Sequence, residues 1–578
     1  MKAPHLKAPR LRIKLVAALF VMGFLIIGGR AVHLQVYCRP WLSQRAAGEY
    51  EKSLSFRGKR GTIYDANGRE MAVSIEVPSV AAYPRRIEGP AAAARTLATA
   101  LSMDVGSLTD QLTGRRRFVW VKRQITPRET EAVRRLQIEG IDFIQEHRRF
   151  YPNRSLAAQL IGFTGIDGHG LEGLEFFYDR HLKGRTGSVT VLRDALGRGF
   201  GSDAPGLDNL TGNSIVLTLD RTVQFITETA LAEGVREVGA SSGIAIVMVP
   251  RTGAILALAH YPFFNPNAFD RFSRERWRNR SITDAFEPGS TLKIFSAAAA
   301  LESGGCTPET IFYCEKGAYQ VGNAVIHDTG SHEWLTLEKI IQLSSNIGAV
   351  KVGEMIGPEP LHRTLRAFGF GEKTGIDCPG ETAGSLAPYH RWSKIHTGTI
   401  AFGHGLSVSA MQLVTAVAAL ANDGVLMKPW IVQAITDFDG RPVRRFEPET
   451  VRRAVSVETA RMVRRMMRKV VESGGTGTRA ALTGYPACGK TGTAQKIDDR
   501  GAYADGKYIA SFVGFAPANA PEVAILVVVD EPVKHHYGGI VAAPVFRRIA
   551  EETLNALNVP PLTDTGRLTA ARETGADG

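Results

Sequence analysis

The chain has 578 residues, of which 44% are hydrophobic and 22% charged, and these are ordinary values for a globular protein of two or three domains. Its 70 basic residues exceed its 57 acidic residues and give a formal net charge of +13. This surplus suits nucleic acid, anionic lipid or an acidic polymer, but arginine pairs such as Arg452-Arg453 and Arg464-Arg465 are dispersed along the chain. Because no motif that reads RNA or DNA accompanies them, we expect no nucleic-acid partner.

The N-terminal segment explains part of the positive charge. Five basic residues precede an uncharged apolar run over 15–29, and no acidic residue appears before Glu49. This pattern predicts a cytoplasmic tail over 1–14 and a transmembrane anchor over 15–36. The run is short against the roughly 20 residues that a span requires, so a cleaved signal peptide is the alternative. Because Gly29-Arg30-Ala31 is a poor cleavage site, we expect an uncleaved anchor in the lipid bilayer, with the remaining chain outside the cytoplasm.

The five cysteines are too few for a fold built on disulfides. Cys306 and Cys314 are close enough in sequence to form a bridge in an oxidising compartment. The other three share no C-x-x-C spacing and are expected to act as small apolar residues. Neither the cysteines nor the adjacent His535 and His536 form a convincing metal site, so we predict no metal and no cofactor.

The region 37–211 is predicted to be a mixed α+β domain with a structural role. Asn67-Gly68 between two strand-like runs predicts a hairpin. Thr126 and Glu129 form a capping box with proline at the first helical position. Further elements expected here are a helix over 90–102 and short strands over 118–121 and 142–144. The segment 187–212 is rich in glycine and aspartate and predicts a linker.

A second domain is expected over 212–557. It should begin with a strand over 215–219 and a helix over 222–234, and its last helix should run over 545–557. Two strand pairs lie at its opposite ends, 243–249 with 254–259 and 509–515 with 523–529, whereas helices such as 411–422 dominate between them. This order predicts an antiparallel sheet built from both ends of the domain, with a helical lobe inserted between them. The polar tail 558–578 is predicted to be disordered.

Within this domain, Ser290 and Lys293 stand at the start of an apolar, alanine-rich run. Pro288 and Gly289 interrupt the preceding structure, and the apolar residues that follow recur at helical spacing, which places Ser290 at the first turn of a buried helix. Lys293 should lie one turn on, beside the hydroxyl, where a buried lysine can lose its proton and act as a base. A single S-x-x-K also arises by chance, and a serine that merely starts a helix explains it equally well.

Two further motifs follow in order. Ser344-Ser345-Asn346 comes just before an apolar helical run, and Lys490-Thr491-Gly492-Thr493 lies in a predicted edge strand whose glycine allows close approach of a ligand backbone. Taken singly, the first could be a helix cap and the second a turn. S-x-x-K, S-x-N and K-T-G in this order are far more specific, and the trio is typical of penicillin-binding proteins and serine β-lactamases.

Acyl transfer accounts for each residue type in the trio. Ser290 is the expected nucleophile and Lys293 the base that takes its proton. Ser344 and Asn346 are suited to hold that base neutral and to relay protons. The expected residues for the terminal carboxylate of a substrate are Lys490, Thr491, Gly492 and Thr493, through a cation and hydroxyl groups. The backbone N–H groups of Ser290 and Thr493 are expected to form the oxyanion hole.

With these motifs in place, the chain resembles the class B penicillin-binding proteins, from its anchor to about residue 557. Segments that match the family's pattern are 60–65 with Asn67-Gly68, 149–152, 170–175, Thr252-Gly253, Asn279-Arg280, 287–290, 511–515 and 537–546. The resemblance is closest to the septal, cell-division branch, the FtsI type, because of the compact pedestal and the segment 402–408. It departs from related patterns at Ser345, where β-lactamases often have aspartate, and at Cys488, where alanine is usual.

The resemblance implies a multidomain α+β and α/β fold: a transmembrane helix, a mixed α+β pedestal of the dimerisation type, and a C-terminal penicillin-binding serine transpeptidase domain. It implies a D,D-transpeptidase that joins peptidoglycan stem peptides through a Ser290 acyl-enzyme during septal wall synthesis. The implied partners are D-Ala-D-Ala stem peptides, β-lactams, a membrane glycosyltransferase of the shape, elongation, division and sporulation family, and other division proteins. The implied location is the cell membrane, with the catalytic domain on the periplasmic side.

Several alternatives stay open on the sequence alone. An elongation-type transpeptidase, a carboxypeptidase and a β-lactamase would carry the same three motifs, although a small secreted hydrolase needs neither the anchor nor the long pedestal. A penicillin-sensing receptor would be expected to have several membrane segments and a cytoplasmic effector domain. A division scaffold that binds β-lactams with little turnover is compatible with every motif.

Overall fold

The computed structural model describes residues 8–43, 51–193, 199–200, 210–322, 324–497 and 502–561. The chain divides into two compact units. The first consists of Met1–Gly58 and Gly184–Thr211, and the second of Lys59–Lys183 and Gly212–Gly578. The cytoplasmic tail predicted over 1–14 is described only from residue 8, and the disorder predicted for the C-terminal tail concerns residues that lie almost entirely outside this description.

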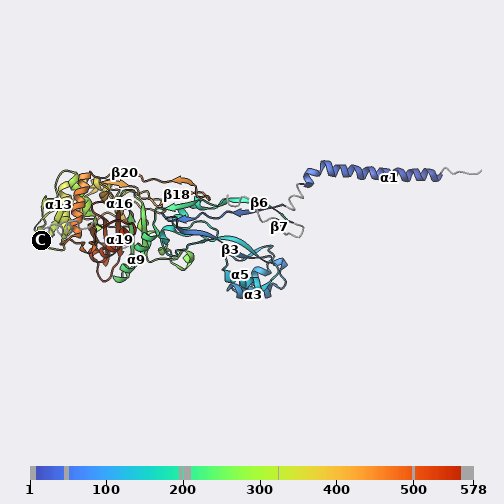
Figure 1. Cartoon of the computed structure of the whole chain (residues 1–578), viewed down its shortest axis with the longest axis horizontal. Coiled ribbons are helices and arrows are strands. Elements are labelled where there is room, and N and C mark those ends of the chain that lie inside the picture. The colour runs from blue at the N-terminus through green and yellow to red at the C-terminus, as the bar shows by residue number, and fades with distance from the viewer. Residues whose placement is uncertain are drawn as a thin grey trace, which may run out of the picture. The chain divides into compact units, whose positions relative to one another are not determined.

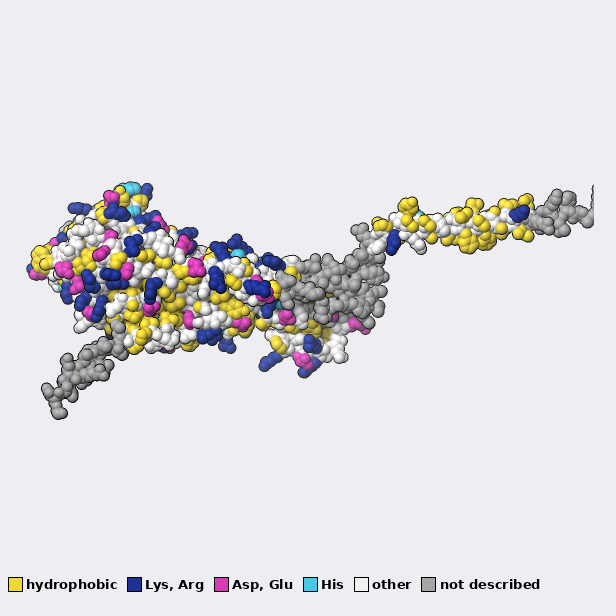
Figure 2. Space-filling view, turned by 45° about the horizontal axis from the view of Figure 1, so that its top comes forward, with side chains coloured by type: hydrophobic (Ala, Val, Ile, Leu, Met, Phe, Trp, Pro, Cys, Tyr) yellow, Lys and Arg dark blue, Asp and Glu magenta, His cyan; other side chains and the backbone are white. Residues whose placement is uncertain are grey.

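The N-terminal helix α1 (Ala8–Val32) continues into a π-helical turn over His33–Tyr37. The stretch Leu11–Tyr37 has 27 residues with a mean hydropathy of 2.2, which makes it long and apolar enough to cross a membrane. Hydrophobic side chains cover this helix (Figure 2). The helical stretch thus includes the predicted anchor 15–36 and begins earlier, because the basic N-terminal residues also adopt helical geometry.

The same unit contains a three-stranded antiparallel sheet in the order β1-β6-β7. Its strands are β1 (Glu51–Arg57), β6 (Thr186–Arg193) and β7 (Gly199–Phe200). The prediction of an irregular linker over 187–212 is therefore wrong where it covers β6 and β7. The sequence of β6 alternates valines with polar residues, at Val189 and Val191, as is typical of a strand. The many glycines around it made the segment resemble a linker.

In the second unit, seven strands join the two predicted domains in one sheet, in the order β19-β18-β8-β2-β3-β4, with β5 also paired to β3. Their bounds are β2 Ile63–Tyr64, β3 Glu70–Ala82, β4 Val119–Lys122, β5 Ile141–Phe150, β8 Ser214–Leu217, β18 Val432–Thr436 and β19 Pro442–Arg445. The predicted hairpin is confirmed, because β2 and β3 are antiparallel around Gly68, whose φ is +76°. β2 runs parallel to β8, so the sheet continues across the expected boundary at residue 211.

Short helices complete the N-terminal part of this unit: α3 (Pro90–Leu101), α4 (Val105–Thr113), α5 (Pro127–Leu136), α6 (Ala158–Ile161), α7 (Gly173–Phe177) and α8 (Asp179–Leu182). α3 follows the predicted helix closely, and the capping box at the start of α5 is confirmed, with Thr126 and Glu129 bonding each other's backbone N–H groups. α3, α4 and α5 pack on β3 and β4 around a separate small core that includes Leu97, Leu108 and Val121.

A buried carboxylate joins the three N-terminal segments that resemble the penicillin-binding proteins. Arg60 Nε lies 2.6 Å from Glu175 Oε2, and Arg149 Nε lies 2.6 Å from Glu175 Oε1. Arg60 also contacts Asp179, at 2.6 Å. Glu175 has no exposed surface, and the two guanidinium groups that bind it are almost completely buried. This buried cluster holds residues 60, 149 and 175 together, so its role is structural.

The C-terminal part of this unit is built on a five-stranded antiparallel sheet in the order β10-β9-β23-β22-β21. The strands are β9 (Ser242–Met248), β10 (Ile255–Tyr261), β21 (Cys488–Ile497), β22 (Tyr503–Ala516) and β23 (Val523–Asp530). Helices α9 (Arg221–Glu237) and α19 (Ala543–Ala556) cover one face, whereas α16 (Ala410–Ala421) packs on the other (Figure 1). The expected sheet from the two ends of the domain is thus confirmed, and β21 is at its edge.

The helical lobe lies between β10 and β21 in the chain. Its helices are α10 (Arg280–Thr283), α11 (Lys293–Glu302), α12 (Leu337–Leu343), α13 (Asn346–Ile356), α14 (Pro358–Ala367), α15 (Lys394–Ala401), α16 and α17 (Val457–Val471), and α18 (Gly538–Val541) follows the sheet. Short strand pairs border them: β11 (Ala285–Phe286) with β16 (Val408–Ser409), β12 (Ile311–Tyr313) with β15 (Trp334–Thr336), β13 (Ala318–Val321) with β14 (Ala324–His327), and β17 (Val425–Met427) with β20 (Thr450–Arg453).

The sequence leaves open whether Cys306 and Cys314 form a bridge, and in the structure both are free cysteines. Cys314 is buried, and its sulfur lies 3.8 Å from the Ser345 hydroxyl and 3.8 Å from the Phe312 carbonyl oxygen. The thiol therefore packs into the interior of the lobe beside the second motif.

The cluster around Glu175 generates a stability prediction. Replacing Glu175 by Gln leaves two buried guanidinium groups without their shared negative charge, and we expect a loss of about 3–5 kcal/mol in the stability of this part of the chain. Thermal unfolding of the detergent-solubilised full chain measures this loss as a lower Tm. Glu139→Gln, which removes an exposed carboxylate of the same region, is the control. Equal Tm values for the two variants would contradict a structural role for the cluster.

Candidate active site

Ser290 lies in a 3-10 turn over Gly289–Leu292 that leads directly into α11. The sequence predicts the buried helix correctly, but this tighter turn precedes it and carries the serine. Gly289 has a φ of +53°, and a Cβ at this position would lie 2.6 Å from the Thr493 carbonyl oxygen. Only glycine therefore fits between the serine turn and β21, and its absence of a side chain brings the first and third motifs together.

Lys293 begins α11 and is almost fully buried, with 1% of its surface exposed. Its Nζ lies 2.7 Å from Asn346 Oδ1, 2.5 Å from the Ser344 carbonyl oxygen and 3.3 Å from Ser344 Oγ. A neutral amine has two hydrogens and one lone pair. The amide and carbonyl oxygens accept both hydrogens, so the lone pair remains to accept a proton from a hydroxyl group.

The second motif gains its geometry from the junction of two helices. α12 ends at Leu343, and the next residue, Ser344, has a left-handed φ of +60°. Ser345 then caps α13, because its hydroxyl accepts a hydrogen bond from the Gly348 N–H at 2.9 Å. Asn346 is the first residue of α13 and donates from Nδ2 to the His327 carbonyl oxygen at 2.9 Å. The helix cap that the sequence offered as an alternative is therefore real, and it presents Ser344 and Asn346 to Lys293.

The third motif lies on β21. Lys490 has no exposed surface, and its Nζ donates to Ser344 Oγ at 2.8 Å. Thr491 Oγ1 lies 3.1 Å from the hydroxyl oxygen of Thr476, and Thr493 Oγ1 accepts from the Gly538 N–H at 3.3 Å. A Cβ on Gly492 would lie 2.2 Å from the Ser511 hydroxyl and 2.7 Å from a Thr291 methyl group. The glycine is thus required by neighbouring protein side chains, and its expected role in the close approach of a ligand backbone stays a prediction.

Burial determines the charge of the two lysines. Loss of solvation lowers the pKa of Lys293 to about 7, although the Asp328 carboxylate opposes this shift. Loss of solvation, with the nearby Lys293 as a second cause, lowers the pKa of Lys490 well below its usual range. Because both amines contact the same Ser344 hydroxyl, each disfavours a charge on the other.

Asp328 is a positioning residue that the motif analysis missed. Its carboxylate accepts the N–H of Ile347 at 3.0 Å and the hydroxyl of Ser345 at 2.5 Å, and it also accepts the N–H of Asn346. A carboxylate at this helix N-terminus fixes the α13 cap and is favoured by the helix dipole. The only sequence signal is an aspartate in the turn after β14, which has no fixed spacing to any of the three motifs.

These residues surround a cleft of about 440 Å³. It is lined by Ser290, Thr329, Leu343, Ser344, Asn346, Phe402, His404, Thr476, Thr478, Arg479, Thr491, Thr493, Tyr537, Gly538, Gly539 and Ile540. Lys293 and Lys490 lie behind this surface, and Arg479 is the exposed cation at the cleft. The glycine- and threonine-rich segment 474–479 is the sequence signal that would have indicated Thr476 and Arg479.

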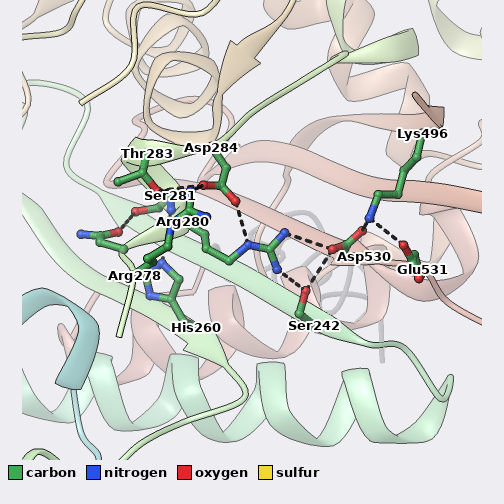
Figure 3. Close-up of polar contacts among 11 residues, drawn as sticks. Ser242, His260, Arg278, Arg280, Ser281, Thr283, Asp284, Lys496, Asp530 and Glu531 are labelled. Atoms are coloured by element: carbon green, nitrogen blue, oxygen red, sulfur yellow. Dashed lines mark hydrogen bonds and ion pairs between the residues drawn. The ribbon is translucent and has the colours of Figure 1, made fainter. Parts of the chain in front are cut away.

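A polar network ties the segment before Ser290 to the sheet (Figure 3). Arg280, which lies ten residues before Ser290, contacts Asp284 at 2.9 Å and Asp530 at 3.1 Å. Asp530 ends β23 and also binds Lys496 of β21, at 2.9 Å. The strand that carries Lys490 and the segment that carries Ser290 therefore share one ionic anchor. Among the described residues, no group of three or more His, Cys, Asp or Glu side chains is arranged to hold a metal.

Comparison with known proteins agrees with this arrangement. The model for the penicillin binding protein transpeptidase domain matches residues 243–551, and that for the penicillin-binding protein dimerisation domain matches residues 56–217. The chain is a class B penicillin-binding protein. This penicillin-binding protein is 37% identical to the probable peptidoglycan D,D-transpeptidase PbpC of Pseudomonas aeruginosa over 554 residues, covering 95% of the chain and 96% of that relative.

Two further relatives support the assignment. The peptidoglycan D,D-transpeptidase FtsI of Escherichia coli is 33% identical over 559 residues, covering 95% of the chain and 92% of that protein. The crystal structure of penicillin binding protein 3 from Mycobacterium tuberculosis, complexed with aztreonam, matches with a TM-score of 0.70 and 30% identity, over 88% of the chain and 98% of that structure. The activity of this penicillin-binding protein is accordingly that of the peptidoglycan D,D-transpeptidases.

The role of Asp328 leads to a testable pH effect. Its negative charge raises the pKa of Lys293, so Asp328→Asn lowers that pKa further and moves the midpoint of the acylation rate towards acid. Weaker support of the Ser345 cap also lowers the maximal rate. The decrease is about tenfold if the activation free energy rises by about 1.4 kcal/mol. Acylation by a fluorescent penicillin between pH 5 and about pH 9 measures both quantities. Asp270→Asn, at an exposed position, is the control, and an unchanged midpoint would contradict the electrostatic role of Asp328.

Proposed function

We propose that this penicillin-binding protein is a serine-type D-Ala-D-Ala transpeptidase that cross-links peptidoglycan stem peptides through a Ser290 acyl-enzyme during septal wall synthesis. The observation that carries the proposal is the meeting of two buried lysines on Ser344, beside the turn that holds Ser290. Burial lowers the pKa of Lys293 to about 7, so about half of these amines are unprotonated near neutral pH and can accept the serine proton.

In the proposed first half-reaction, Ser290 Oγ attacks the carbonyl carbon of the penultimate D-alanine while Lys293 takes the hydroxyl proton. The peptide C–N bond breaks, the proton passes to the leaving D-alanine amine, and the acyl group stays on Ser290. Ser344, Asn346 and Lys490 form the relay and electrostatic support for this transfer. In the second half-reaction, an amine of a neighbouring stem takes the acyl group and Ser290 regains its proton.

Substrate contacts follow from the cleft. The hydroxyl groups of Thr491 and Thr493, with Gly492 keeping the strand close to the serine turn, are assigned to the terminal carboxylate of the donor. The exposed guanidinium of Arg479 adds a positive charge to the residues expected from the sequence, which include Lys490 as the cation. The backbone N–H groups of Ser290 and Thr493 are assigned to the oxyanion hole.

We further assign residues 1–14 to a cytoplasmic tail, 15–36 to a single membrane anchor, 37–211 to the pedestal, 212–557 to a transpeptidase domain on the periplasmic side and 558–578 to a tail. The apolar stretch Leu11–Tyr37 and the matched family ranges 56–217 and 243–551 support this order of segments. The proposed partners are stem peptides, β-lactams, a membrane glycosyltransferase and other division proteins. A β-lactam in the related aztreonam complex supports the second of these.

The nucleophile can be tested by labelling. A fluorescent penicillin should label membranes that contain the wild-type chain and leave Ser290→Ala unlabelled, because the alanine side chain provides no oxygen for an acyl bond. Ser303→Ala, at the C-terminal end of α11, should retain wild-type labelling. If Ser290→Ala is labelled as strongly as the wild type, another residue is the nucleophile.

The septal role needs a test in cells, because a division scaffold and an elongation-type transpeptidase share the site. In cells depleted of the native protein, wild type should restore septation and Ser290→Ala should leave filaments, although it is present at the same level. Rescue by Ser290→Ala would favour the scaffold. A depletion phenotype of rounded or widened cells with normal septa would favour elongation.

A further inference from the structure

Three side chains outside the S-x-x-K, S-x-N and K-T-G motifs contact one another: Glu287, His404 and Tyr503. Of these, His404 lines the cleft. Glu287 comes between β11 and the Ser290 turn, His404 follows α15, and Tyr503 begins β22. His404 Nδ1 lies 2.9 Å from the Tyr503 hydroxyl oxygen and 3.3 Å from Glu287 Oε2. The Tyr503 hydroxyl in turn donates to Glu287 Oε2 at 3.2 Å. The acylation step described above uses none of the three.

This cluster is attached directly to the nucleophile turn. The N–H of Gly289 donates to the Gly403 carbonyl oxygen at 3.1 Å, so the residues next to Ser290 and His404 in the chain are hydrogen bonded. Ser290 and His404 line the same cleft, and the His404 ring packs against Phe402, with 5.1 Å between ring centroids. The Gly405 N–H donates to Glu287 Oε1 at 2.8 Å and fixes the turn from its other side.

The partners of Nδ1 determine which nitrogen of His404 carries the proton. An ionised carboxylate only accepts hydrogen bonds, and the hydrogen of the Tyr503 hydroxyl is directed to Glu287, so both partners favour a hydrogen on Nδ1. The lone pair of the neutral ring is then on Nε2. Nε2 forms no hydrogen bond with any residue in the described part of the chain, and the side chain keeps 25% of its surface exposed at the cleft.

The second half-reaction of the proposed transpeptidase needs a second base with a free lone pair at the cleft, and the residues assigned so far do not supply one. An acceptor amine arrives largely as an ammonium ion near neutral pH and has no lone pair with which to attack the acyl-ester. Lys293 can remove one proton during the attack, as the reverse of its role in acylation. The first proton of the ammonium must be accepted by a second base.

We propose that His404, held by Glu287 and Tyr503, receives the acceptor ammonium at Nε2 and takes this first proton. The proposal rests on the function proposed above. The neutral amine then attacks the acyl carbon, a C–N bond forms, and the ester bond to Ser290 Oγ breaks. The second amine proton passes through Lys293 to the serine oxygen, and the imidazolium releases the first proton to solvent, so that all protons are accounted for.

The electrostatic surroundings agree with a neutral ring. Burial lowers the pKa of His404 and the positive charge of Lys293 adds to this, whereas the Glu287 carboxylate opposes it. The titratable groups that face the ring are therefore Glu287, Tyr503 and Lys293, and Arg479 and Tyr537 line the same cleft. The Tyr503 hydroxyl stays protonated, since burial and Glu287 raise its pKa to about 12.

The test separates the two half-reactions in the detergent-solubilised full chain. Fluorescent penicillin measures acylation, which needs no acceptor. A small D-alanyl thioester supplies the acyl group, and D-alanine amide is the acceptor amine, with an α-amino pKa of about 8. We expect His404→Gln to keep at least about half of the acylation rate and to form the amide product at least about tenfold more slowly at pH 6.5, roughly one and a half units below the acceptor pKa. His390→Gln, at an exposed histidine outside the cleft lining, should match the wild type in both assays.

A change of pH distinguishes a proton acceptor from a structural residue. At about pH 9, most D-alanine amide is already deprotonated in solution, so the defect of His404→Gln should shrink towards the wild-type rate. Tyr503→Phe, which leaves the carboxylate contact to Nδ1, should show a smaller defect with the same dependence on pH.

Amide formation by His404→Gln at the wild-type rate would overturn the proposal. A defect that persists at high pH would also overturn it, as would an equal loss of acylation and transfer. If the wild type itself neither binds penicillin nor consumes the thioester, it is the proposed function that fails.

Discussion

Two lysine side chains buried against one serine hydroxyl are the constraint on which the site depends. Lys293 and Lys490 lie 3.3 and 2.8 Å from Ser344 Oγ, and neither amine is hydrated as a free ammonium would be. Simultaneous positive charges on Lys293 and Lys490 are strongly disfavoured, because both amines are buried and contact the same hydroxyl group. The Asp328 carboxylate offsets only part of this effect on Lys293. The protein thereby holds an amine base next to the proposed nucleophile, at a pH where exposed lysines are protonated.

The rest of the fold keeps these groups in place. Each lysine comes from a different element, α11 or β21, and Ser344 comes from the junction of α12 and α13, so tertiary packing must fix all three. Glycines at 289 and 492 let the serine turn approach the edge strand, and Asp530 links that strand to Arg280. In the N-terminal part of the unit, the buried carboxylate of Glu175 holds three separate segments together, because it binds both Arg60 and Arg149.

The sequence predicts the motif residues and the sheet that carries them, but it does not predict which other side chains contact them. Ser290, Lys293, Ser344 and Lys490 follow from motif order, and the sheet follows from alternating apolar residues at the two ends of the domain. Asp328 and His404 did not follow, because a lone aspartate or histidine in a turn has no local signal of what it will face. The protein contacts that also require Gly492 could not be predicted for the same reason, since Thr291 and Ser511 reach it only after folding. Strand β6 was missed because its partner β1 lies more than a hundred residues away.

The central claim is that burial lowers the pKa of Lys293 until a large fraction of this base is unprotonated near neutral pH, and its titration tests this most directly. NMR of the full chain with ¹³C-labelled lysine would follow the Cε resonance that is absent from Lys293→Met. The account predicts that this resonance titrates with a midpoint of about 7. A midpoint near 10.4, the value of an exposed lysine, would contradict it.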